Sequence, residues 1–498
     1  MTRKQIILHP FLLAIQPIAF LYSMNVNYPI SHWDWATPLL ISITGAIIAF
    51  TLLGRKMDGQ KAGLVTSLAV ILFYTYGHAY NIISVLMIGH YSTPLYFQLF
   101  ITYLAILACF TLITWKTGRD LKVITDGLNI ISIFLIAYPL MSIILFKESR
   151  ALSCGQGPQV VASDVKSEDI RPDIYYIILD GYAHHDVLNE TFGFDNTEFL
   201  GFLDGKGFHT PKDARTNYAL TFLSLASSMN MQYHTDIPEK LAAGRDQGII
   251  FRKISGNKVT DILRSRGYEF IQVSSGWGPT DQDFGTGTYK QCGLHEFQMV
   301  LLDTTLLTPF TRLLKRRGAL CSFDTISKAS MMTGKPVFVF AHILPPHPPF
   351  IFDDNGGPVP LEDWGNNDGQ SWHPRRLYVK QLRFINSQLK ELITDLTGRE
   401  GKKPVIILQA DHGPASSAHI DKPTEELYIE RMRIFMSVYN QGKSGRIIGN
   451  RSSPVNIFPS VLNEVFNTAY DLPDDSSYYS TKRQPYIFIN VTERLDAD

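Results

Sequence analysis

Long apolar runs without charged side chains dominate the first 146 residues of this 498-residue chain. About 20 consecutive apolar residues are enough to cross the hydrocarbon core of a bilayer. A large water-soluble protein accommodates one such run as a buried helix, but five runs with short connections favour a membrane domain. The five expected spans are Pro10–Met24, Trp35–Gly54, Ala62–Ile88, Pro94–Trp115 and Leu128–Phe146.

The first run is short and follows Arg3 and Lys4, as the apolar part of a secretory signal peptide would. No small-residue cleavage site follows it and further spans do, so we interpret it as a retained helix. Lys and Arg then occur in alternate connections, which places the N-terminus in the cytoplasm. The chain after Phe146 is therefore expected outside a bacterial cytoplasmic (inner) membrane, in the periplasmic or extracellular space.

Residues 1–146 are thus predicted to form the membrane domain, 147–171 a polar linker, and 172–498 an outer domain. The chain has 46 basic and 46 acidic residues, so its net charge gives no reason to expect a nucleic-acid partner. Disulfides can persist outside the cytoplasm. A bridge between Cys292 and Cys321, with Cys154 single, is one pairing among several that the sequence leaves open.

Short β-rich runs alternate with helical patterns in the outer domain. This alternation predicts an α/β domain with a mostly parallel sheet covered by helices on both faces. The expected strands are Ile174–Leu179, Glu269–Val273, Val337–Ala341 and Val405–Gln409, and the expected helices are Thr197–Lys206, Thr221–Met231, Val259–Arg266 and Tyr378–Leu396.

Potential metal ligands follow three of these strands. Asp180 ends the first, Asp411 and His412 end the last, and the stretch VFVFAHILPPHPPF supplies His342 and His347. Ligands gather beyond the carboxyl ends of the strands in such sheets. Carboxylates and imidazoles suit a zinc- or manganese-like ion. A strand-end Asp can also simply cap a turn, but three strand ends converging by accident is a weaker explanation.

A hydroxyl nucleophile is available at the start of a predicted helix. Thr221 and Ser224 lie there, where the positive end of the helix dipole favours bound phosphate. A metal ion on such a hydroxyl lowers its pKa and activates it for attack. An ordinary helix cap is the alternative role for the same residue types.

The order of these motifs resembles a known group of enzymes. An LDG strand end, a Thr-x-x-Ser-Leu helix start, an HPPF loop and an ADHG strand end are similar to the sulfatase-like branch of the alkaline phosphatase superfamily. Five spans before the outer domain resemble lipoteichoic acid synthases and lipid A phosphoethanolamine transferases. The chain lacks the Cys/Ser-x-Pro-x-Arg run of formylglycine sulfatases, which disfavours sulfate ester hydrolysis. Lipid A phosphoethanolamine transferases resemble one another in Cys residues that flank the Thr, and this chain differs from them in having no Cys near Thr221.

The resemblance implies roles for individual residues. Thr221 would be the catalytic nucleophile, and it would bind the metal together with Asp180, Asp411 and His412. A second metal or the substrate would be bound by His342, His347 and His419. Possible pocket residues are Trp277 and Asn217.

The implied activity is a phosphoryl-headgroup transfer through a phosphothreonine. The donor would be a membrane phospholipid, the acceptor a surface glycan or lipid, and the group glycerol-phosphate or ethanolamine-phosphate. A hydrolase with the same site, acting as a phosphodiesterase or sulfatase-like enzyme, is the alternative. A non-catalytic sensor or transporter is a third hypothesis, to which His78 within a span lends some support.

Overall fold

The computed structural model describes residues 5–84, 93–151, 171–234, 237, 246–360, 363, 372–401, 403–441 and 447–496. The chain forms two compact units, and their composition does not follow the chain order. The first contains residues 1–158 together with 295–312, and the second contains 159–294 and 313–498. Cys154 and most of the expected linker lie outside the described residues.

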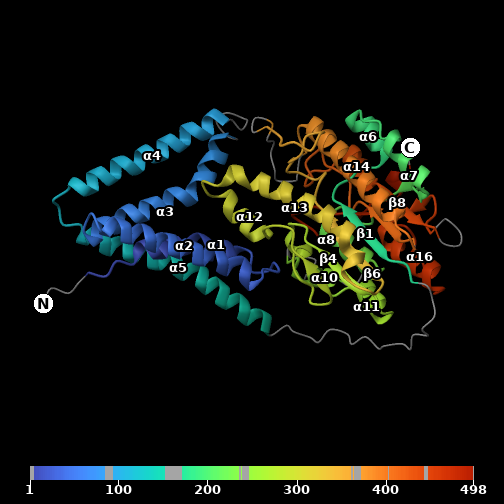
Figure 1. Ribbon diagram of the computed structural model, residues 1–498, viewed down its shortest axis with the longest axis horizontal. Coiled ribbons are helices and arrows are strands. Elements are labelled where there is room, and N and C mark those ends of the chain that lie inside the picture. The colour runs from blue at the N-terminus through green and yellow to red at the C-terminus, as the bar shows by residue number, and fades with distance from the viewer. Residues whose placement is uncertain are drawn as a thin grey trace. The chain divides into compact units, whose positions relative to one another are not determined.

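Five apolar helices make up most of the first unit (Figure 1). Helix α2 begins at a capping box, in which Ser31 accepts from a backbone N–H and Asp34 accepts from the Ser31 N–H. Among the described residues, four helices are long and apolar enough to cross a membrane, whereas α1 has 16 residues. The end of the third expected span, residues 85–88, is outside the described residues. The helices are α1 (His9–Met24), α2 (His32–Gly54), α3 (Gly59–Ile82), α4 (Thr93–Lys116) and α5 (Lys122–Ala151).

A segment far along the sequence completes this unit. Helix α12 (Glu296–Asp303) contacts α1 and α2, and the start of α13 (Thr308–Lys328) follows it. Phe297 and Leu301 form a small core with Ile18 of α1. This packing could not be predicted from the sequence, because the pattern of a short amphipathic helix shows which face is buried but not which partner covers it.

A seven-stranded sheet forms the centre of the second unit, in the order β2-β8-β7-β1-β6-β4-β5. All neighbours run parallel except β8, which is antiparallel to β7 and to β2. The predicted mostly parallel sheet is confirmed. The strands are β1 (Ile174–Leu179), β2 (Phe208–His209), β4 (Glu269–Val273), β5 (Thr288–Lys290), β6 (Val337–Ile343), β7 (Val405–Gln409) and β8 (Met436–Asn440).

Helices pack on both faces of this sheet. Consecutive residues of a strand point to opposite faces, and β1 shows this with two tyrosines. The Tyr176 ring lies 4.8 Å from that of Phe458 in α16, and its hydroxyl is 2.6 Å from Ser228 Oγ of α8. Tyr175, which points to the opposite face, lies near Asp395 of α14, and α14 contacts α6 and α7. The main helices are α6 (His185–Phe192), α7 (Thr197–Lys206), α8 (Thr221–Asn230), α10 (Gly248–Ser255), α11 (Lys258–Ser265), α14 (Arg375–Gly398), α15 (Glu425–Met432) and α16 (Pro454–Phe466).

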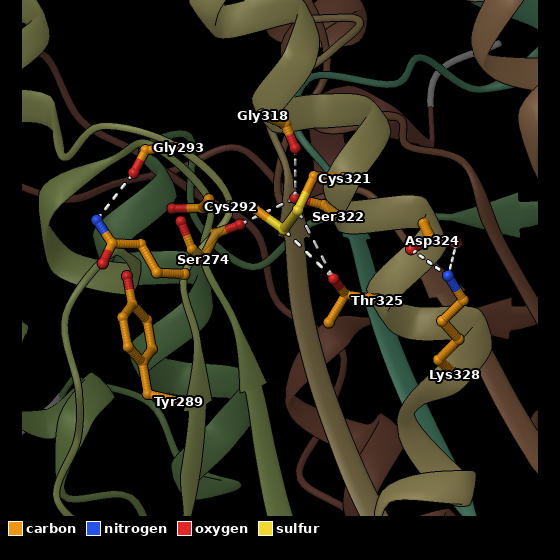
Figure 2. The surroundings of a disulfide bond; sticks show 12 residues. Ser274, Tyr289, Cys292, Gly293, Gly318, Cys321, Ser322, Asp324, Thr325 and Lys328 are labelled. Atoms are coloured by element: carbon orange, nitrogen blue, oxygen red, sulfur yellow. Dashed lines mark hydrogen bonds and ion pairs between the residues drawn. A yellow bond between two sulfur atoms is a disulfide. The ribbon is translucent and has the colours of Figure 1, made fainter.

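One disulfide joins Cys292 to Cys321, with the two Cα atoms 5.5 Å apart. Figure 2 shows the bond beside Thr325, whose hydroxyl oxygen lies 3.3 Å from Cys292 Sγ. Both cysteines belong to the second unit, although the residues between them include the segment 295–312 of the first. The bridge therefore links the part of the chain that precedes this segment to the part that follows it.

Candidate functional site

Three neighbouring strands bring the predicted ligands together. The order β7-β1-β6 places the carboxyl end of β1 between those of the other two, so Asp180 lies between the side chains that follow them. His412 Nε2 is 3.2 Å from Asp411 Oδ2 and 3.6 Å from Asp180 Oδ1. From the other side, His342 Nε2 is 3.4 Å from Asp180 Oδ2. Two carboxylates and two imidazoles thus converge at one edge of the sheet.

The glycine after each strand end is required by the local geometry. Gly181 has a φ of 73°, and a Cβ atom there would lie 2.1 Å from the Trp372 ring. At Gly413, a Cβ atom would lie 2.1 Å from the Glu430 carbonyl oxygen. The chain can turn away from β1 and β7 at these points only without a side chain, which explains the Asp-Gly and Asp-His-Gly patterns.

Thr221 is the first residue of α8, and its side chain reaches the cluster. Its Oγ1 lies 3.0 Å from His412 Nε2, and the residue is half-buried. Ser224, the other hydroxyl considered, is fully buried and lies 3.3 Å from the Thr216 hydroxyl oxygen. A nucleophile must be reachable by a substrate, so this arrangement favours Thr221.

The tautomer of His412 leaves a nitrogen free for this cluster. Its Nδ1 lies 3.0 Å from the Gly413 carbonyl oxygen, to which only a protonated nitrogen can donate. The proton is therefore on Nδ1, and the lone pair of Nε2 faces the carboxylates and Thr221. This is the arrangement that a metal-binding histidine commonly adopts.

Burial dominates the electrostatics of the site. It raises the pKa of Asp180, and burial together with the charge of Asp180 raises the pKa of Asp411. Burial also holds the pKa of His412 well below its usual value and lowers that of His342 to about 4. The histidines are therefore neutral and bring no positive charge to the two carboxylates, whereas a bound divalent cation would supply it.

The donor atoms fit a divalent metal ion. Asp180, Asp411 and His412 each offer one potential ligand atom, and these three atoms lie within 4.8 Å of one another. Asp180 Oδ1 and Asp411 Oδ2 are buried and receive no hydrogen bond from the residues that the structure describes. Buried oxygens of this kind are costly unless something binds them. A carboxylate, carboxylate and imidazole set is a common one for such ions.

The other predicted residues lie at different distances from this cluster. The ring of His347 lies 6.2 Å from that of His412, and Trp277 packs edge-on against His342 with ring centres 5.5 Å apart. His419 is half-buried and its Nδ1 accepts from the Asp421 N–H, outside the ligand group. The Asn217 amide is bonded to Tyr233, Ser476 and Val455 instead of facing the cluster.

Two side chains near the site had no recognisable sequence signal. Arg431 is buried, and its guanidinium donates to the carbonyls of Ala219 and Gly413, at 2.9 and 2.8 Å. It thereby links the chain before Thr221 to the chain after His412. Trp372 is fully buried, with its ring centre 4.7 Å from that of His347. An isolated Arg or Trp carries no motif, so only the fold reveals these contacts.

Similar proteins were found among solved structures. The integral membrane lipooligosaccharide phosphoethanolamine transferase A of Neisseria meningitidis is 12% identical, with a TM-score of 0.44, and the match covers 92% of this chain and 95% of that one. The periplasmic domain of EcEptC from Escherichia coli is 11% identical, with a TM-score of 0.42, covering 65% and 94%. A phosphonate monoester hydrolase of Agrobacterium radiobacter is 10% identical, with a TM-score of 0.41, covering 62% and 80%.

No curated protein matches the chain. The family comparison gives a clear result, because residues 212–465, just over half of the chain, match the Sulfatase family. The matched stretch includes Thr221, His342, His347, Asp411 and His412, whereas β1 and Asp180 precede it. The chain therefore belongs to the sulfatase family of the alkaline phosphatase superfamily.

Proposed function

We propose that this protein is a metal-dependent transferase that moves a phosphoryl-linked headgroup, glycerol-phosphate or ethanolamine-phosphate, from a membrane phospholipid to a surface glycan or lipid. The observation that carries the proposal is the position of Thr221, a reachable hydroxyl at a helix N-terminus 3.0 Å from His412 Nε2 and beside two buried carboxylates. Family membership supports an enzyme of this superfamily.

Asp180, Asp411, His412 and Thr221 would hold the metal, which we propose to be zinc or manganese. A bound cation at this position lowers the pKa of the Thr221 hydroxyl and offsets charge on phosphate oxygens. The partial positive charge at the N-terminus of α8 acts on the same oxygens. His342 and His347 border the cluster, and we assign them to the substrate or to a second metal.

The reaction has two displacements. Thr221 Oγ forms a bond to the phosphorus of the donor phospholipid, and the bond from that phosphorus to the diacylglycerol oxygen breaks. The released diacylglycerol gains the proton that Thr221 lost. An acceptor hydroxyl then attacks the same phosphorus, the bond from phosphorus to Thr221 Oγ breaks, and Thr221 Oγ takes up the proton that the acceptor loses. The first product leaves before the acceptor reacts, so ping-pong kinetics are expected.

The apolar helices support an integral membrane protein. We propose a multi-pass protein of the bacterial inner membrane, with a cytoplasmic N-terminus and the catalytic unit on the periplasmic or extracellular side. A donor from the bilayer suits this location, because phospholipid headgroups are available at the surface.

Mass spectrometry of the Thr221 peptide tests the proposal. The purified full chain would be incubated with metal and bacterial phospholipids, and the mass added to the peptide names the transferred group. The Ser224→Ala variant is the matched control, since this buried hydroxyl of the same helix should not be needed. An unmodified Thr221 in protein that holds metal and turns over substrate would exclude the covalent mechanism.

Two other functions remain testable with the same protein. A hydrolase would release the headgroup at a rate that an added glycan acceptor does not change, whereas a transferase would pass the group to the acceptor. A non-catalytic sensor or transporter would keep its cellular function in the Thr221→Ala variant, and the proposed enzyme would lose it.

A further inference from the structure

The segment His295–Arg312 contacts the apolar helices well inside their ends. Gly77 donates its N–H to the Thr304 carbonyl at 2.9 Å, and the Phe73 carbonyl accepts the Leu306 N–H at 3.1 Å. Gly77 and Phe73 precede the last residue of α3, Ile82, by five and nine residues. At about 1.5 Å per residue, these contacts lie about 7 and 13 Å inside that end of the helix.

Helix α12 lies at a similar depth against the other helices. Its buried residues Phe297 and Leu301 pack on Ile18, six residues before the end of α1. Trp35 and Leu39, near the start of α2, also line this small core. The segment therefore contacts the C-terminal parts of α1 and α3 and the N-terminal part of α2.

Gly77 allows the close approach. A Cβ atom there would lie 2.2 Å from the Asp303 carbonyl oxygen and 2.6 Å from the Thr304 carbonyl carbon. Both are backbone atoms, so a change of side-chain rotamer cannot relieve the overlap. By contrast, a Cβ atom on Gly45 in α2 would meet nothing within 4 Å.

The turn between α12 and α13 has its polar groups bonded to protein. The Tyr96 hydroxyl donates to the Leu306 carbonyl, the Thr305 hydroxyl to the Leu302 carbonyl near the end of α12, and the Thr308 hydroxyl to the Thr305 carbonyl. The Thr311 hydroxyl donates to Asp303 Oδ1 at 2.5 Å. Non-helical backbone at membrane depth is stable only where protein groups satisfy it in this way.

The outer side of the segment is apolar. Val300, Leu307 and Phe310 are 41%, 38% and 58% exposed. Helices α1 to α4 of the same unit also carry many exposed Ile, Leu and Phe residues. Lipid acyl chains are the surroundings that suit such a surface at this depth.

We propose that His295–Arg312 is embedded in the outer leaflet of the membrane, where Val300, Leu307 and Phe310 contact lipid acyl chains. The segment lies in the catalytic part of the sequence, yet it belongs to the membrane unit. Besides the linker, the chain then joins the two units at both ends of this segment, after Leu294 and before Leu313. The inference rests on the proposed crossing of a membrane by the apolar helices.

Spin labels in the full chain, reconstituted in phospholipid nanodiscs, test this. Cys109 and Cys154 are replaced by Ala, and a single cysteine for labelling is introduced by Phe310→Cys. Ile101→Cys in α4 is the lipid-facing control, 64% exposed, and Leu472→Cys in the catalytic unit is the water-facing control, 56% exposed. Collision with apolar oxygen and with a water-soluble nickel complex reports the surroundings of each label.

The expected oxygen-to-nickel accessibility ratio at Phe310 equals that at Ile101 and exceeds that at Leu472. A nickel-accessible label at Phe310, with Ile101 protected, would overturn the insertion while leaving the proposed enzyme intact. A label protected from both reagents would mean that protein covers the site, which also overturns it. A nickel-accessible Ile101 would remove the membrane crossing on which the inference rests.

The packing of the segment His295–Arg312 against α3 is tested with the same spin label. Gly77→Ala should increase the mobility and the nickel accessibility of the Phe310 label, because the added methyl group displaces the backbone of Asp303 and Thr304. Gly45→Ala should leave both unchanged. Equal behaviour of the two variants would contradict the docked arrangement.

Discussion

The Asp411→Asn substitution should stabilise the metal-free protein while abolishing its metal binding. Asp411 is fully buried, and its pKa is raised from 3.8 to about 7 by burial first and by the charge of Asp180 second. Folding therefore disfavours the ionised form. The difference of about three pKa units corresponds to about 4 kcal/mol, at about 1.36 kcal/mol per unit.

The pH dependence of this effect has a definite sign. A carboxyl group with a raised folded-state pKa contributes no penalty below its unfolded pKa of 3.8. The penalty grows as the pH rises and is complete above about 7. Asparagine has no such penalty, so the two proteins should differ little at pH 4 and most at pH 8.

The amide fits the existing contacts. Its oxygen can accept the Gly181 N–H, which now bonds to Asp411 Oδ1 at 3.1 Å. Its NH₂ group would take the place of Oδ2, which receives no hydrogen bond from the described residues. This group can donate to the lone pair of His412 Nε2, 3.2 Å from Oδ2, or to the neighbouring Asp180 carboxylate. The substitution therefore removes a buried charge and leaves no buried donor without an acceptor.

Thermal unfolding of the full chain in detergent with a chelator measures the effect. For a domain of this size, about 1 kcal/mol corresponds to about 2 °C or less, so Tm should rise by up to roughly 8 °C at pH 8. Asp353→Asn, which changes a turn carboxylate outside the cluster, is the control. A metal-free Asp411→Asn protein that is less stable than the unsubstituted one at pH 8 would refute the electrostatic reasoning.

Three further outcomes are expected. Metal affinity, measured by competition with a chelating dye, should weaken as the pH falls below about 7, because protons compete with the metal for Asp411. The loss should be up to about tenfold per pH unit for each proton displaced, and an affinity that does not change with pH would contradict this. Gly181→Ala should cost at least about 2 kcal/mol of stability in denaturant titrations, since Trp372 blocks the added Cβ, and should cost more than Gly193→Ala, which shares a positive φ but has open space. Cys292→Ser should lower Tm by removing a bridge between residues 29 apart, a loss of about 3.6 kcal/mol in a chain-entropy account, and an unchanged Tm would show that the bridge is dispensable.

The sequence determined those features that depend on local patterns. Uncharged runs near the length of a bilayer predicted the apolar helices, because length and hydropathy are properties of one segment. Alternating strand and helix patterns predicted the mostly parallel sheet, and the strand-end rule predicted that Asp180, Asp411 and His412 converge.

Tertiary structure decided which distant residues meet. It brought Thr221 to His412, set His419 outside the ligand group and directed the Asn217 amide to other partners. Sequence spacing cannot give these results, because side-chain direction depends on how each element packs. For the same reason only the fold placed His295–Arg312 among the apolar helices. Its short apolar stretch buries one face in any setting, and the close backbone contact at Gly77 is a property of two segments rather than of either one.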